Sequence, residues 1–167
     1  MNRFFSRRIK KAKKNSSSIQ IYHHRLFPWE DLIDVLYPLF YADYQYEDLI
    51  ALINAANHIF CAYDENEGCV GCALLKDSSI RGLYVSLFGV RQSSQHRGVG
   101  TQLLEKIIRW ARRTYYRFIS LHVHVLNHKA IGLYEKVGFR KEDYLTNFYY
   151  QSSKPKPDAF QMILYLR

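Results

Sequence analysis

The sequence has few of the residues that mark several common protein classes. It contains three cysteines in 167 residues, so a disulfide-held scaffold is not expected and a reducing compartment fits better. No stretch approaches the roughly 18 uninterrupted apolar residues of a transmembrane helix, and no apolar segment near the N-terminus resembles a secretory signal. Because 48% of the residues are hydrophobic, the chain can form a folded core, and its length predicts one domain.

Acidic residues are absent from positions 1–18, and this segment carries seven of the nine net positive charges of the chain. The rest of the chain is therefore close to neutral. We interpret 1–18 as a disordered basic arm and 19–167 as the folded domain. The arm is compatible with a nuclear address, with an anionic partner (a ribosome, RNA or a membrane surface), or with a transit peptide. We expect a cytoplasmic protein, with the nucleus as an alternative, and the oligomeric state stays open.

Hydrophobic spacing predicts alternating strands and helices. Pro38 should end the first helix and 37–46 should form a loop. Asn127 is a suitable N-cap for the last helix, and Gly138 follows its end. This pattern predicts an α/β domain with a mixed sheet. The expected strands are 18–22, 58–63, 69–75, 81–90, 118–125, 139–145 and 159–166, and the expected helices are 28–36, 47–54, 98–113 and 128–137.

The segment between the fourth strand and the longest helix is rich in glycine. Two glycines allow a ligand to approach the backbone closely, and the free N–H groups of the first helical turn form an anion site. Neither the dinucleotide-binding glycine pattern nor a P-loop is present. We therefore predict a pyrophosphate cradle, built from Gln95, His96, Arg97, Gly98, Val99, Gly100 and Thr101.

Two motifs resemble those of the GNAT acetyltransferases. Gln95-x-x-Gly98-x-Gly100 is similar to their acetyl-CoA motif, and the segment 127–139 is similar to their block N-x-x-A-x-x-x-Y-x-x-x-G-F. The resemblance implies the GNAT fold, a mixed and mostly antiparallel sheet flanked by helices, with acetyl-CoA as co-substrate and no metal. It also implies further contacts to acetyl-CoA from Phe88, Gly89, Val90, Asn127 and Tyr134.

Other segments resemble the N-terminal acetyltransferases of the NatE and NatF types. The strands around Tyr84 and His122 look like those that carry the catalytic tyrosine and histidine of these enzymes. The resemblance implies a protein N-terminus as substrate, with methionine first, and Tyr134 as the acid for the departing thiolate. Phe88 and Gln95 depart from it, since leucine and arginine are common there. The implied substrate-binding residues are Tyr37, Pro38, Leu39, Tyr41, Tyr149 and Tyr150.

The residues agree with this chemistry. A free α-amine titrates near 7.7–8.0, so a tyrosine or a histidine, acting through one water, is a sufficient base. The strand 81–90 contains no carboxylate, which disfavours a glutamate base. Backbone N–H near Val90 is the expected oxyanion donor, and His124 shares a strand face with His122.

Two alternatives to this function stay open. The chain can be a GNAT enzyme that acts on lysine or a small amine, or a non-catalytic module that binds CoA. A metal site at Cys69-x-x-Cys72 is disfavoured, because residues i and i+3 of a regular strand point to opposite faces.

Overall fold

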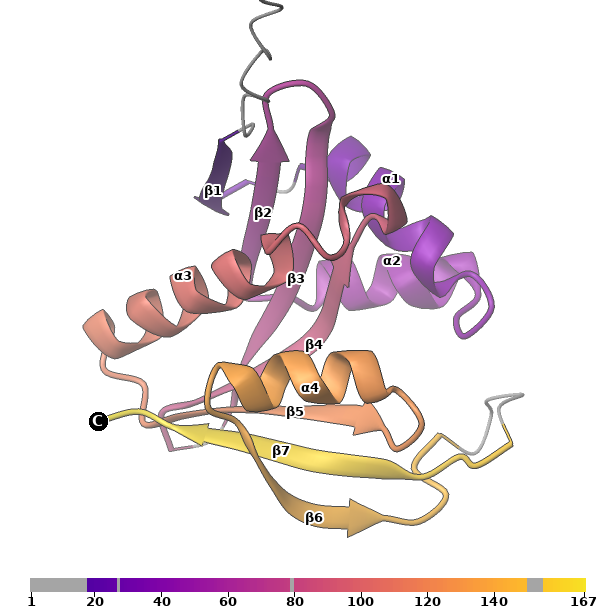
Figure 1. Ribbon diagram of the computed structural model, residues 1–167, viewed down its shortest axis with the longest axis vertical. Helices are drawn as coiled ribbons and strands as arrows, with labels where there is room; N and C mark the ends of the chain where they lie inside the picture. Colours follow the sequence, from indigo (N-terminus) through magenta and orange to yellow (C-terminus); the bar gives the residue numbers. More distant parts are fainter. Residues whose placement is uncertain (1–17, 27, 79, 150–154) are drawn as a thin grey trace, which may run out of the picture.

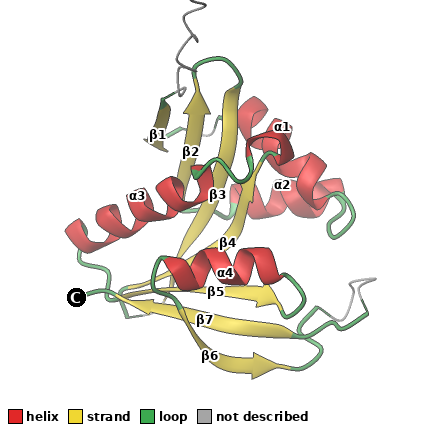
Figure 2. Cartoon of the chain, in the orientation of Figure 1, coloured by secondary structure: helices red, strands yellow, loops and turns green. Residues whose placement is uncertain are grey.

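The computed structural model describes residues 18–26, 28–78, 80–149 and 155–167. Within these ranges the chain forms one seven-stranded sheet and four α-helices (Figures 1 and 2). The strands are β1 (Ile19–His24), β2 (His58–Asp64), β3 (Gly68–Ser78), β4 (Gly82–Val90), β5 (Phe118–His124), β6 (Arg140–Leu145) and β7 (Ala159–Tyr165). The helices are α1 (Trp29–Phe40), α2 (Tyr46–Asn54), α3 (Val99–Arg113) and α4 (His128–Lys136).

The sheet is mixed and mostly antiparallel, as predicted. Its strand order is β1-β2-β3-β4-β5-β7-β6, and among these neighbours only β4 and β5 run parallel. The β4–β5 pairing is short, because it joins Gly82–Val85 to Phe118–Leu121 and then stops. Beyond Val85 the two strands diverge, so the middle of the sheet opens into a wedge (Figure 1).

The two largest apolar clusters of the described residues lie on the two faces of the sheet. The α3 and α4 helices bury residues such as Leu103, Ile107 and Ile131 on one face. On the other face, α1 and α2 bury Leu36 and Ile53 against β2, β3 and β4. The helical spacing of these side chains explains why each helix covers the sheet with one face only.

The first helix continues through Pro38, so the prediction that Pro38 ends it was wrong. α1 runs to Phe40, Tyr46 already begins α2, and the expected loop is reduced to residues 41–45. A proline removes one helical hydrogen bond. Packing compensates for this loss, since Leu36, Leu39 and Phe40 all lie against the backbone of Gly89 on β4.

The three cysteines lie together on one face, so the expectation of opposite faces for Cys69 and Cys72 was also wrong. A β-bulge causes this, because Ala62 pairs with Gly71 while Tyr63 pairs with Cys69, which leaves Val70 as an extra residue. The sulfur of Cys72 lies 3.5 Å from that of Cys61 and 3.6 Å from that of Cys69. All three are buried beneath α1, where their sulfur atoms form weak mutual S–H bonds.

Several local predictions are confirmed. The Asn127 side chain accepts the N–H of Ala130 and caps α4, and Gly138 follows the helix with φ of 106°. Residues 1–17, which form almost all of the predicted arm, lie outside the described residues. Within the described ranges, no helix is long and apolar enough to cross a membrane.

Candidate active site

A cleft of about 710 Å³ occupies the wedge between β4 and β5. Its walls come from segments that are far apart in the sequence. They include Val85–Phe88 of β4, Leu121–His124 of β5, the α1–α2 connection, the start of α4, and the β6–β7 connection at Phe148 and Tyr149. The site therefore exists only because the two parallel strands separate here.

Tyr84 on β4 and His122 on β5 meet where the pairing of the two strands ends. His122 lines the cleft, and Tyr84 lies one residue before the lining segment Val85–Phe88. The Tyr84 hydroxyl lies 3.0 Å from Nδ1 of His122. Burial raises the pKa of Tyr84, with a smaller contribution from nearby Tyr44, and burial lowers the pKa of His122. Tyr84 is thus protonated and His122 neutral near pH 7, so the hydroxyl can donate to Nδ1. The pair is held by the ring of Phe148, whose centroid is 4.3 Å from that of His122.

Tyr134 lies in the same cleft on α4. It is only 7% exposed, and burial raises its pKa. Its ring contacts Phe88 edge to face, with the centroids 6.1 Å apart. A protonated hydroxyl at this place can donate to an anionic leaving group. Asn127 also lines the cleft, in addition to capping α4.

The glycine-rich loop ends in an open helix N-terminus. Gly98 precedes α3 with φ of 80°, and no side chain caps the first turn. A side chain at Gly100 would meet Leu133, because an added Cβ would lie 3.0 Å from its Cδ2. Val99 is buried and anchors the turn. The backbone N–H groups of this turn are therefore accessible at a fixed position, which suits a phosphate.

Arg97 does not contribute a free positive charge to this cradle. Its guanidinium donates to Asp64 at 2.9 Å and also to Glu67, both from the β2–β3 hairpin. The hydrogen bond from Arg97 holds the pKa of Glu67 below its usual range. Arg97 thus fastens the loop to the sheet, and its charge is paired with these two carboxylates. His96 is exposed, with φ of 60°.

The end of β4 presents its backbone to the wedge. The N–H of Arg91 donates to Val70 on β3 at 2.8 Å, and successive residues of a strand point their N–H groups to opposite sides. The N–H of Val90 therefore points toward the opening. On that side, Nε2 of Gln95 donates to the Val90 carbonyl at 3.0 Å, which fixes the peptide orientation.

The structure brings together only part of the predicted substrate-binding set. Tyr149 lines the cleft, whereas Tyr150 lies outside the described residues. Tyr37, Pro38, Leu39 and Tyr41 do not line it, and Leu39 instead packs over Gly89. From this segment and α2 the lining residues are Phe40, Asp43, Tyr44, Asp48, Ala51, Leu52 and Ala55.

Sequence reasoning missed these residues because it ended α1 at Pro38. The apolar residues at positions 32, 36, 40 and 44 follow one another at intervals of four. This helical spacing continues past the proline and was a usable signal for Phe40 and Tyr44.

Comparisons with known proteins agree with this geometry. The sequence pattern of the acetyltransferase (GNAT) family matches residues 20–139. N-alpha-acetyltransferase 50 from Danio rerio is 26% identical over 127 residues, which cover 75% of each chain. A Bacillus subtilis acetyltransferase in complex with CoA superposes with a TM-score of 0.75 at 18% identity, over 90% of this chain and 100% of the other. The ribosomal-protein-S18-alanine N-acetyltransferase from Escherichia coli gives 0.70 at 22% identity, over 88% and 94%.

Proposed function

The chain belongs to the acetyltransferase (GNAT) family, and we propose that it transfers the acetyl group of acetyl-CoA to the α-amine of protein N-termini, with methionine as the preferred first residue. The transfer of acetyl from acetyl-CoA to an amine follows from the family. The choice of an α-amine is the proposal, and the observation that carries it is the Tyr84–His122 pair, in which Tyr84 bonds the histidine that lines the cleft.

The residues of this chain fit acetyl-CoA. The uncapped first turn of α3 offers N–H groups to the pyrophosphate. The absence of a side chain at Gly100 lets this turn pack closely against Leu133 of α4, which holds the N–H groups beside the cleft. The wedge between β4 and β5 then receives the pantetheine arm and the thioester, and the N–H of Val90 is available to the developing negative charge on the acetyl oxygen.

Tyr84 and His122 remove the proton from the amine. Tyr84 takes this proton, directly or through one water, as it passes its own to Nδ1 of His122. Burial keeps His122 neutral and therefore able to accept, because it lowers the pKa of the ring. On the other side of the reacting carbonyl, the Tyr134 hydroxyl donates its proton to the departing sulfur. Each proton thus has a donor and an acceptor within the cleft.

This weak base is sufficient for an α-amine but poorly suited to a lysine. At pH 7.4 roughly a quarter of α-amines are neutral, compared with about a thousandth of lysine amines. A lysine acceptor needs a stronger base, and β4 offers no carboxylate in the cleft. Asp43 and Asp48 also line the cleft, and their carboxylates can attract the ammonium form of the substrate before it loses its proton.

The cleft also has surface for an apolar first residue. The rings of Phe40, Tyr44, Phe148 and Tyr149 all line it. Burying a methionine side chain against such rings gains about 1.5–3 kcal/mol. A first residue with an acidic side chain would lose hydration and face Asp43 and Asp48, so it should be disfavoured.

Acetylation of matched peptides tests this proposal. One peptide has a free N-terminal methionine and no lysine, and the second has a blocked N-terminus and internal lysines. Third and fourth peptides begin with serine and glutamate. We expect rapid acetylation of the first, slower reaction of the serine and glutamate peptides, and almost none of the blocked one. Efficient acetylation of the blocked peptide, with no reaction at free methionine, would establish the lysine alternative instead.

A further inference from the structure

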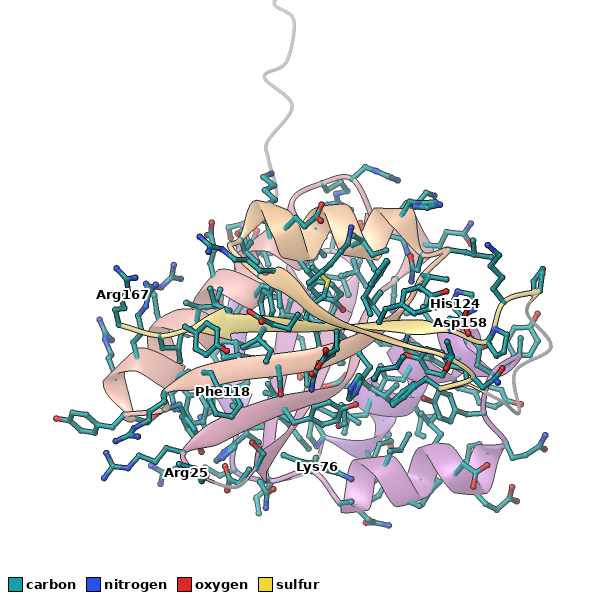
Figure 3. The ribbon with its side chains drawn as sticks, turned by 90° about the horizontal axis from the view of Figure 1, so that it is seen from below. Arg25, Lys76, Phe118, His124, Asp158 and Arg167 are labelled. Carbon is teal, nitrogen blue, oxygen red and sulfur yellow. The ribbon has the colours of Figure 1, made fainter. Side chains whose placement is uncertain are left out.

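His124 is a second histidine in the cleft, and the mechanism above does not use it. It follows His122 by two residues on β5, so both side chains project from the same face of the strand. Both line the cleft. In Figure 3, His124 lies beside Asp158, at the end of β7 farthest from Arg167. Its ring stacks on Tyr149, with the centroids 5.8 Å apart and the planes at 25°.

The hydrogen bonds of His124 determine which nitrogen carries its proton. The backbone N–H of Leu126 donates to Nδ1 at 3.1 Å, so Nδ1 is an acceptor and the neutral ring carries its proton on Nε2. His124 is 7% exposed. Its Nε2 is buried and has no hydrogen-bond partner among the residues that the structure describes.

The described groups around His124 do not supply the missing acceptor. Both carboxylate oxygens of Asp158 are already engaged, one with the Tyr144 hydroxyl and the other with the N–H of Asn147 at 2.8 Å. A buried N–H donor without an acceptor is costly. In a cleft that receives a substrate, such a donor is satisfied when the substrate supplies an oxygen.

We propose that Nε2–H of His124 donates to the carbonyl oxygen of the first residue of the acceptor peptide. This inference rests on the proposed function. Two residues along a strand are separated by about 6.6 Å. This spacing suits a substrate whose amine reaches the Tyr84–His122 pair while its first carbonyl reaches His124.

Every peptide N-terminus has a carbonyl two bonds from its amine, but the end of a lysine side chain has none. His124 would therefore help the enzyme to distinguish the two acceptor classes.

Three peptides that differ only at the first linkage isolate this contact. The first has the normal amide, the second an ester that keeps the carbonyl but lacks the N–H, and the third a trans-alkene that lacks both. Each is assayed with the wild type, His124→Phe and His124→Gln, and kcat/KM is expressed per neutral amine. We expect the wild type to disfavour the alkene relative to the ester by about tenfold or more, mainly through KM.

In His124→Phe, which keeps a stacking ring but has no donor, this preference should fall close to unity. His124→Gln keeps an N–H donor and should retain part of it. His128→Phe, at an exposed histidine outside the cleft lining, is the matched control and should behave like the wild type. The melting temperature and the KM for acetyl-CoA are measured alongside, because the His124→Phe change also removes the acceptor for the Leu126 N–H.

Two results would overturn the assignment to His124. One is an unchanged ester-to-alkene ratio in His124→Phe. The other is an equal loss of rate on all three peptides, which would indicate a structural role. Failure of the proposed function would give another result: the wild type would acetylate none of these free-amine peptides. That result would refute both the proposed function and the inference about His124.

Discussion

Replacing Tyr84 by phenylalanine separates the chemical role of the Tyr84–His122 pair from its structural one. The change removes a single hydroxyl, which lies 3.0 Å from Nδ1 of His122, and leaves the ring in place. One net hydrogen bond contributes about 0.5–1.5 kcal/mol to stability. For a chain of this size, 1 kcal/mol corresponds to roughly 2–4 °C in melting temperature. The variant should therefore fold and melt within a few degrees of the wild type.

The loss of activity should be much larger. If Tyr84 relays the amine proton, its removal should lower kcat by about 10²–10⁴-fold, which is roughly 2.7–5.4 kcal/mol of transition-state free energy. The KM for acetyl-CoA should change little, since the hydroxyl bonds His122 and is not among the groups that we assign to acetyl-CoA. Steady-state kinetics with a methionine-starting peptide, together with thermal melts, measure both quantities.

The pH dependence gives a further check of the same pair. Burial lowers the pKa of His122, so His122 loses its proton, and thereby becomes a base, below its ordinary value of about 6.5. Activity corrected for the neutral amine should rise with pH through this lowered pKa and be level above about 6.5. A Tyr84→Phe enzyme with kcat within threefold of the wild type, or an acid limb centred above 6.5, would refute the relay.

Four other changes, the first with a matched control, test separate parts of the structure. Acetyl-CoA at a hundredfold excess over Kd should stabilise the wild type by about 2.7 kcal/mol, and Gly100→Val should abolish this stabilisation. The control Gly132→Ala, at an open helical position, should still be stabilised by acetyl-CoA and should itself stabilise the chain by about 1 kcal/mol. Arg97→Ala leaves the buried Asp64 without this ion pair and should cost about 1–3 kcal/mol in denaturant unfolding, so an unchanged midpoint would contradict the anchoring role. Cys72→Ser puts a hydroxyl among apolar side chains and should cost about 1–3 kcal/mol, whereas a Ser variant as stable as the wild type would show that the site is polar. Deletion of residues 1–17 should leave kcat/KM on peptides unchanged while salt-sensitive binding to RNA or anionic vesicles is lost; a loss of peptide activity would place the arm in the folded domain.

Local sequence patterns determined much of this protein. The amphipathic spacing of 99–113 specified α3, and the N-cap and terminal glycine specified the ends of α4, because these signals involve residues within one or two helical turns. Alternation along β5 placed His122 and His124 on one face for the same reason. The glycine-rich loop was also readable, since its position between a strand and a helix is itself a local feature.

The remaining features depend on contacts between residues far apart in the chain, which no local pattern encodes. The end of β4–β5 pairing at Val85 opens the cleft, and the packing of α1 on Gly89 carries the helix past Pro38. A single bulge at Val70 reverses the face of Cys69. Only the folded chain shows that Arg97 pairs with the β2–β3 hairpin. The same holds for His124, whose Nδ1 accepts a hydrogen bond while its Nε2 has no partner among the described residues. Hydrogen-bond satisfaction is a property of the tertiary arrangement, because the partners of a buried polar group are chosen by packing and not by sequence neighbourhood.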